Sequence, residues 1–153
     1  MIGYTLTPLI AYMSKLQKKP AQQHKIVVEQ SAKESGGKYS LLYIEAAPGV
    51  NNPMQYHKKI SKTFEVLEGN VTVEMYNQKK VLKKGERLTI RPGVPHRIYS
   101  NTGKVSKMYA MVMPGHLGYE EFVAEQFNAD KHDKDSETIN KTCIEADSYR
   151  ESN

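Results

Sequence analysis

Short runs of alternating apolar and polar residues fill the chain between residues 25 and 114, and such alternation is typical of half-buried β-strands. Leu42 and Ile44 fall on one side of one run, and Val71, Val73 and Met75 fall on one side of another. Glycine, proline and asparagine separate the runs. The pattern predicts seven strands, at residues 26–29, 39–46, 63–67, 71–76, 87–90, 97–99 and 105–113. Regular short strands with such turns predict an all-β domain, either a sandwich or a barrel.

The segment before the strands follows a helical pattern. Thr7 and Pro8 are suited to the N-cap and the first position of a helix, and apolar residues recur at helical spacing after them. The spacing predicts a short amphipathic helix over residues 8–18. We therefore expect residues 1–24 to form a helical N-terminal arm that caps the barrel or crosses to a second subunit.

The pattern changes again after the last strand. Aromatic and apolar residues with helical spacing predict a C-terminal helix over residues 118–127, so the barrel and this helix together span residues 25–127. Residues 128–153 carry many charges and few apolar side chains. Such a composition predicts a loosely ordered tail.

The length and the cysteine content narrow the class of protein. A chain of 153 residues predicts one domain. No stretch of 18 apolar residues is present, so we expect no membrane-spanning helix, and the first residues do not have the pattern of a secretory signal. The single cysteine, Cys143, cannot form an internal disulfide. A cytoplasmic location is the expectation that follows.

The net charge is +5, but the basic residues are spread along the chain, around residues 15–19, 58–62 and 79–84. Proteins that bind nucleic acid usually gather this charge on one face, so we expect no nucleic-acid partner. The lysines of residues 79–84 flank an apparent hairpin, where lysine protects a solvated sheet edge from aggregation. A small anionic molecule is a plausible partner for a basic protein of this kind.

Two segments carry the candidate chemistry. The first runs from Pro48-Gly49 through Gln55-Tyr56-His57 to Phe64-Glu65-Val66-Leu67-Glu68-Gly69, and the second runs from Gly85 through Pro92-Gly93-Val94-Pro95-His96-Arg97 to Asn101. Together they resemble the two motifs of the cupin superfamily, with a likeness over roughly residues 25–125. The resemblance implies a double-stranded β-helix, the jelly-roll barrel of small single-domain cupins, which agrees with the strand pattern.

The resemblance also implies a metal site. In metal-binding cupins, two histidines and a glutamate from the first motif and a histidine from the second surround one divalent ion. His57 and His96 match two of these positions, but Gln55 replaces the other histidine and Lys62 replaces the glutamate. Such a site would use His57, His96 and the amide oxygen of Gln55 to hold Fe, Mn, Ni, Cu or Zn. Because a lysine ammonium repels a cation, the cofactor is either such a metal or none.

Other acidic residues and histidines are weaker candidates. Glu65 lies three residues after Lys62 and should face the opposite side of the strand. Glu45 could approach from another strand. His24 lies outside both motifs and is expected at the surface.

Lys62 suggests a second kind of site. Its charge of +1 equals that of a divalent ion combined with a glutamate, so Lys62 could replace the ion and attract an anionic ligand. The alternative is that Lys62 extends outward and the barrel is simply filled by its core. Ligand-binding candidates on the barrel strands are Lys62, Phe64, Tyr43 and Met111.

These observations favour a small-molecule-binding cupin whose ligand is anionic. A metal-dependent dioxygenase or isomerase of the cupin type is the alternative that the resemblance implies, and a non-catalytic sensor or interaction protein is the second alternative. The residues leave open whether the protein is an enzyme. Cupins of this kind are often dimers, so we expect a homodimer.

Overall fold

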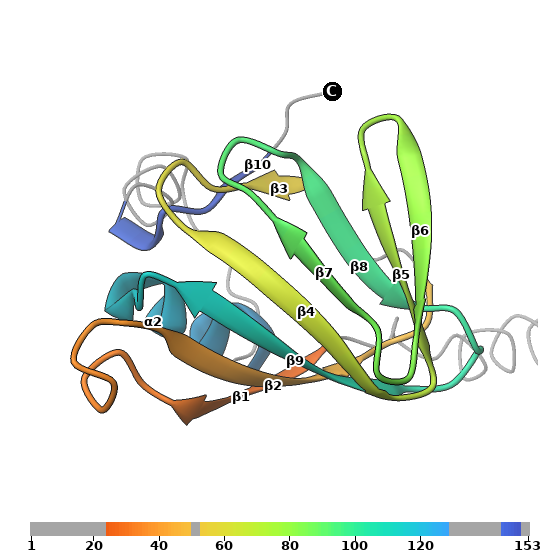
Figure 1. The fold of residues 1–153 in the computed structure, drawn as a ribbon, viewed down its shortest axis with the longest axis horizontal. Coiled ribbons are helices and arrows are strands. Elements are labelled where there is room, and N and C mark those ends of the chain that lie inside the picture. Colours follow the sequence, from red (N-terminus) through yellow and green to blue (C-terminus); the bar gives the residue numbers. More distant parts are fainter. Residues whose placement is uncertain (1–23, 50–52, 129–144, 151–153) are drawn as a thin grey trace, which may run out of the picture.

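The computed structural model describes residues 24–49, 53–128 and 145–150 (Figure 1). The described chain forms two antiparallel sheets of five strands each. In spatial order, the first sheet contains β1 (Lys25–Gln30), β2 (Ser40–Ala46), β9 (Ser106–Met113), β4 (Ser61–Glu68) and β7 (Arg87–Ile90). The second contains β10 (Tyr149–Arg150), β3 (Gln55–Tyr56), β8 (His96–Ser100), β5 (Asn70–Met75) and β6 (Gln78–Lys83). The predicted all-β class and jelly-roll architecture are confirmed.

The core lies between the two sheets. In β2 and β9 every second residue is buried, as the apolar alternation predicts. The removal of these apolar side chains from water is the main stabilising term of the fold. The largest fully buried side chains are Phe64, Leu42, Ile60, Leu82, Met108, Val66, Val71, Val73, Val112 and Val123.

Three observed strands were not among the predicted seven. Strand β6 is an edge strand with a single buried residue, Leu82, so its sequence shows no apolar alternation. It forms because it pairs residue by residue with β5. Strands β3 and β10 have two residues each, which is too short for a periodic pattern.

The C-terminal helix is present as α2 (Leu117–Asn128) and contacts β1. The predicted N-terminal arm, with its helix over residues 8–18, lies outside the described residues. The predicted loose tail needs a correction at residues 145–150, which pack against the barrel and include β10. These residues also lie close to α2: a Cβ atom added at Gly118 of this helix would collide with the carbonyl oxygen of Glu145.

Candidate functional site

Strand β4 supplies two of the candidate residues, Lys62 and Phe64. Alternate residues of β4 are buried, so these two side chains share the inward face of the strand. Lys62 is only 7% exposed, and its amine nitrogen lies 5.3 Å from the centre of the Phe64 ring. The structure therefore places Lys62 inside the barrel and not along its outer surface.

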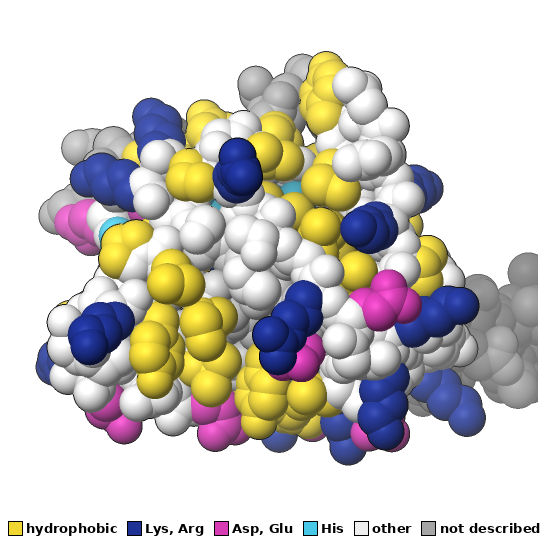
Figure 2. All heavy atoms as spheres, viewed as in Figure 1, with side chains coloured by type: hydrophobic (Ala, Val, Ile, Leu, Met, Phe, Trp, Pro, Cys, Tyr) yellow, Lys and Arg dark blue, Asp and Glu magenta, His cyan; other side chains and the backbone are white. Residues whose placement is uncertain are grey.

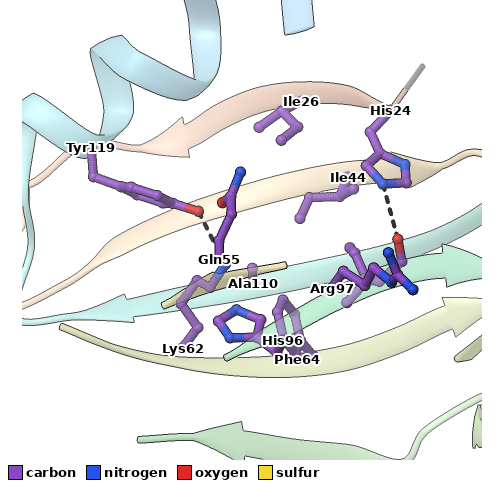
Figure 3. A pocket seen from close by; sticks show the side chains of 11 residues that line it. His24, Ile26, Ile44, Gln55, Lys62, Phe64, His96, Arg97, Ala110 and Tyr119 are labelled. Atoms are coloured by element: carbon purple, nitrogen blue, oxygen red, sulfur yellow. Dashed lines mark hydrogen bonds between the residues drawn. The ribbon is translucent and has the colours of Figure 1, made fainter. Parts of the chain in front are cut away.

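The second sheet brings Gln55 and His96 to the same place. They are paired across β3 and β8, and His57 follows β3 by one residue. The ring centres of His57 and His96 are 5.4 Å apart, and the ring of His57 lies edge-on to that of Tyr119 at 5.2 Å. Gln55, Lys62 and His96 line one cavity (Figure 3), and His57 adjoins it through these ring contacts.

Hydrogen bonds fix the tautomers of the two buried histidines. His57 Nδ1 lies 2.7 Å from the carbonyl oxygen of Asp147, and His96 Nδ1 lies 2.9 Å from the carbonyl oxygen of Val94. A carbonyl oxygen only accepts, so both Nδ1 atoms carry the proton and both Nε2 atoms present a lone pair. Both Nε2 atoms are buried and have no hydrogen-bond partner among the described residues.

Burial keeps both imidazoles neutral. Desolvation, together with the nearby charge of Lys62, lowers the pKa of His57 to about 3. The same two causes hold the pKa of His96 well below the ordinary value of 6.5. The two histidines therefore act as hydrogen-bond acceptors or metal ligands at neutral pH, and not as cations.

Lys62 is paired with a hydroxyl group instead of an acid. Its Nζ donates a hydrogen bond of 3.2 Å to the hydroxyl oxygen of Tyr119, from helix α2. Desolvation lowers the pKa of Lys62 to about 7 and raises the pKa of Tyr119 above its ordinary value. The amine is therefore close to half protonated at neutral pH, whereas the phenol keeps its proton.

The cavity has a volume of about 40 Å³ and combines apolar walls with a few polar groups. Residues that the sequence analysis did not select include Tyr119, Arg97 and His24. His24 was expected at the surface, but it is buried because its ring bridges the backbone of Ile98 and Ala47. Arg97 belongs to the second motif but was not selected from it. No motif marks Tyr119 and His24, which reach the cavity from segments that are distant in the sequence.

Tyr43 and Met111 do not line this cavity, so their assignment to it is corrected. Each follows the opposite parity to the buried residues of its strand, and each lies half-buried on the outer face of the first sheet. There Tyr43 packs edge-on against Tyr109 at 6.1 Å. Strand alternation explains this placement, because Leu42 and Ala110, their neighbours in sequence, occupy the inner face.

Asp147 is a supporting residue that the sequence analysis missed. Its carboxylate accepts hydrogen bonds from the backbone amides of Lys58, Lys59 and Ile60, at 2.8–3.0 Å. Its backbone carbonyl orients His57. The charge-rich sequence around it gives no signal of this role, which depends on the return of residues 145–150 to the barrel.

In a comparison with models of known protein families, residues 42–113 match the cupin domain. This region contains Gln55, His57, Lys62 and His96. The chain contains a cupin domain. A search of the curated proteins gives no match.

Solved structures support the same fold for this cupin domain. An uncharacterized conserved protein with a double-stranded β-helix domain from Klebsiella pneumoniae has 17% identity and a TM-score of 0.54, covering 67% of this chain and 86% of its own. A predicted oxalate decarboxylase from Thermotoga maritima has 14% identity and a TM-score of 0.55, covering 60% and 80%. A sugar phosphate isomerase of the cupin superfamily from Silicibacter pomeroyi has 12% identity and a TM-score of 0.52, covering 61% and 60%. At these identities the likeness concerns the fold alone.

The donor set of this cupin domain does not fit the metal site that the resemblance implies. Glu65 faces outward and pairs with Arg87, and Glu45 shares the outer face with Tyr43. The oxygen of the Gln55 amide accepts a hydrogen bond from Ser148. Within residues 24–49, 53–128 and 145–150, no group of three or more histidine, cysteine or acidic side chains could hold a metal ion. Of the candidate metal ligands, only the two imidazoles of His57 and His96 remain, and the amine of Lys62 lies in the same part of the barrel.

In the part of the chain that the structure describes, no helix has both the length and the apolar character needed to cross a membrane.

Proposed function

We propose that this cupin domain binds a small anionic molecule in the barrel cavity and that Lys62 supplies the positive charge. The observation that carries the proposal is the burial of the Lys62 amine without an acidic partner. Among the described residues, its side-chain hydrogen bond is to the neutral hydroxyl of Tyr119, and the ion pairs involve other cations. An uncompensated buried charge is costly, and an anionic ligand would offset this cost.

Arg97 is the other cation that lines the cavity, but its charge is already paired. Its guanidinium forms two hydrogen bonds to the carboxylate of Glu74, at 2.9 and 3.2 Å. Lys62 is therefore the cation that is available to a ligand among the described residues that line the cavity.

The size and the walls of the cavity favour a compact anionic group. A buried water needs at least about 10–15 Å³ of such volume, so about 40 Å³ admits roughly three water-sized atoms. This matches a carboxylate group. The side chains of Ile26, Ile44 and Phe64 form apolar walls, which suit the carbon atoms attached to such a group.

Two structural neighbours are named after anionic substrates, namely oxalate and a sugar phosphate. Both named compounds are anions, which agrees with the proposal of an anionic ligand. The proposal itself depends on Lys62, because the likeness to these proteins extends only to the fold.

The test compares anion binding by the wild-type protein with binding by two charge-removing variants. Formate, acetate and phosphate are titrated while amide chemical shifts are followed by NMR. Lys62→Met should abolish saturable shifts at the cavity. Lys59→Met removes the same charge from an exposed side chain and should bind as the wild type does. Equal binding by the Lys62→Met variant, or no binding by the wild type, would refute the proposal.

Binding should also depend on pH in one direction. Because the pKa of free Lys62 is about 7, its ammonium form is lost as the pH rises through 7, and affinity should fall by about tenfold per pH unit above that value. The histidines and the tyrosine around it stay neutral over this range, since burial lowers the pKa of His24, His57 and His96 and raises that of Tyr119. Arg97 keeps its charge, which is paired with Glu74 throughout.

The metal-dependent dioxygenase or isomerase is the alternative function. The two Nε2 atoms of His57 and His96, which lack partners among the described residues, favour it, and the adjacent amine of Lys62 argues against it. One equivalent of a transition metal per chain, measured by elemental analysis, would make this alternative the better explanation.

The expectations about partners and location stay predictions. We expect a homodimer in the cytoplasm, with no nucleic-acid or membrane partner. The lysine and arginine side chains are scattered over the face shown in Figure 2 and do not gather in one patch there.

A further inference from the structure

The Lys62 amine lies among groups that would assist covalent chemistry. It is buried in a cavity and hydrogen-bonded to a phenol, and its charge acts on two imidazoles whose Nε2 lone pairs have no partner among the described residues. We infer that Lys62 Nζ is a nucleophile that forms a reversible imine with a small carbonyl compound, an aldehyde or a 2-oxo acid. The inference rests on the proposed function, since the same cavity must admit the ligand, and it adds a covalent step.

An amine attacks a carbonyl carbon only with its free lone pair, and burial favours this neutral form. No described carboxylate stabilises the ammonium form of Lys62. Its pKa of about 7 supports this reasoning, because the neutral fraction at pH 7 is then roughly a thousandfold larger than for an exposed lysine. The cavity thus holds an amine that is more reactive than the surface lysines.

The neighbours of Lys62 provide a proton donor and a hydrogen-bond acceptor. The Tyr119 hydroxyl is 3.2 Å from Nζ and keeps its proton, so it can donate to the oxygen of an attacked carbonyl. His96 lines the same cavity and presents a lone pair at Nε2, which can accept a hydrogen bond from the amine and orient it. His57 adjoins them with a second lone pair. Such a donor beside an oriented amine suits general acid catalysis of the attack.

The proposed step balances without another reactant. The ammonium form of Lys62 first gives up one proton to water, and the neutral nitrogen forms a bond to the carbonyl carbon while the C=O π bond breaks. A proton moves from nitrogen to oxygen, which gives a carbinolamine. Its hydroxyl then leaves as water with the proton that the ammonium gave up, and the nitrogen lone pair forms the C=N bond. No oxidation or reduction occurs, and water reverses the reaction.

The protonated imine keeps the positive charge at this position. The carboxylate of a 2-oxo acid would therefore retain its electrostatic partner after the covalent bond forms. Because the positive charge is kept, a 2-oxo acid is the ligand that best matches both the anion proposal and the nucleophile.

The test uses pyruvate as the carbonyl probe and lactate as the matched control, because lactate has the carboxylate but no ketone. The full-length protein is incubated with each in the presence of cyanoborohydride, which reduces the protonated imine to a stable amine. With pyruvate, we expect one adduct per chain whose added mass is that of pyruvic acid less one oxygen atom. Peptide mapping should locate it on Lys62, labelled at least about tenfold faster than the exposed Lys58 and Lys59.

The wild-type map needs no variant, so it is informative even if Lys62 variants fail to fold. Tyr119→Phe keeps the amine and should slow the labelling of Lys62.

Lactate binding, followed by NMR without reductant, separates the two proposals. Lactate binding without a Lys62 adduct would overturn the imine alone, and the absence of both would overturn the imine and the anion site. An adduct without lactate binding would support the nucleophile and contradict the anion site. Equal labelling of Lys58, Lys59 and Lys62 would overturn the imine.

Discussion

The most unusual residue of this protein is a lysine in the interior of a β-barrel. Lysine is almost never fully buried without a partner, yet the amine of Lys62 lies near the rings of Phe64 and Tyr119 and shares its cavity with the neutral His96. A barrel core built for stability alone would place an apolar side chain there. This burial is the basis of our proposal that the position serves a ligand at some cost in stability.

The cost of burying Lys62 gives a prediction for the pH dependence of the free energy of unfolding. The pKa of Lys62 falls from 10.5 in the unfolded chain to about 7 in the folded one. Between these values the unfolded chain binds the proton and the folded protein does not, so wild-type stability should rise with pH by about 1.4 kcal/mol per unit. The full penalty is present below pH 7 and is gone above pH 10.5.

Lys62→Met removes this titration and should stabilise the protein at pH 7 by a few kcal/mol. The difference from wild type should shrink toward zero at pH 10, as measured by urea unfolding at pH 7, 8, 9 and 10. Lys59→Met, at an exposed position, should change stability by less than about 0.5 kcal/mol. A constant difference across this pH range would show that Lys62 does not titrate as the structure indicates.

At the scale of elements, residues 145–150 hold the loop that leads from β3 into β4. Asp147 satisfies the backbone amides of Lys58, Lys59 and Ile60, and Tyr149 stacks on Tyr56 at 5.4 Å. This loop also contains His57. The terminal segment therefore positions one of the candidate site residues from a distance of 90 residues along the chain.

Removal of the Asp147 carboxylate should destabilise the protein by about 1–3 kcal/mol, because one buried and two partly buried amides lose their acceptor. Asp147 has a φ of 51°, so Asp147→Gly removes the carboxylate without adding backbone strain. The expected result is a lower denaturation midpoint and faster hydrogen exchange at the amides of residues 58–60.

Asp147→Asn is the control, since asparagine tolerates a positive φ and keeps one acceptor oxygen. Its stability should fall between those of the wild type and Asp147→Gly. If both variants matched the wild type, the terminal segment would contribute nothing to this loop.

For the whole molecule, the buried histidines limit stability in acid. The pKa of His57 is about 3 in the folded protein and 6.5 in the unfolded chain. Between these values only the unfolded chain binds the proton, so the contribution of His57 to stability is constant above pH 6.5 and falls in acid by about 1.4 kcal/mol per pH unit. His96 adds a loss in the same direction.

His57→Asn removes one titrating group and keeps a hydrogen-bond donor near the position of Nδ1. We expect its urea midpoint to fall less steeply than that of the wild type between pH 6.5 and 4.5. A parallel fall in both proteins would contradict the burial of His57 as a neutral group.

The sequence by itself determined the fold and half of the site. Alternation is a local property of a strand, so it predicted the inward face of β2 and β9. The resemblance to the two cupin motifs selected Gln55, His57, Lys62 and His96 before their three-dimensional placement was known. The same parity argument would have excluded Tyr43, whose neighbours Leu42 and Ile44 face the core.

Only the tertiary structure decided the partners of these residues. Tyr119 comes from helix α2, Asp147 from the terminal segment and His24 from the residue before β1. None is within reach of Lys62 or His57 through local periodicity. The physical reason is that a pKa, an orphaned lone pair and an unpaired charge depend on everything packed around a group, and that environment exists only after the chain has folded.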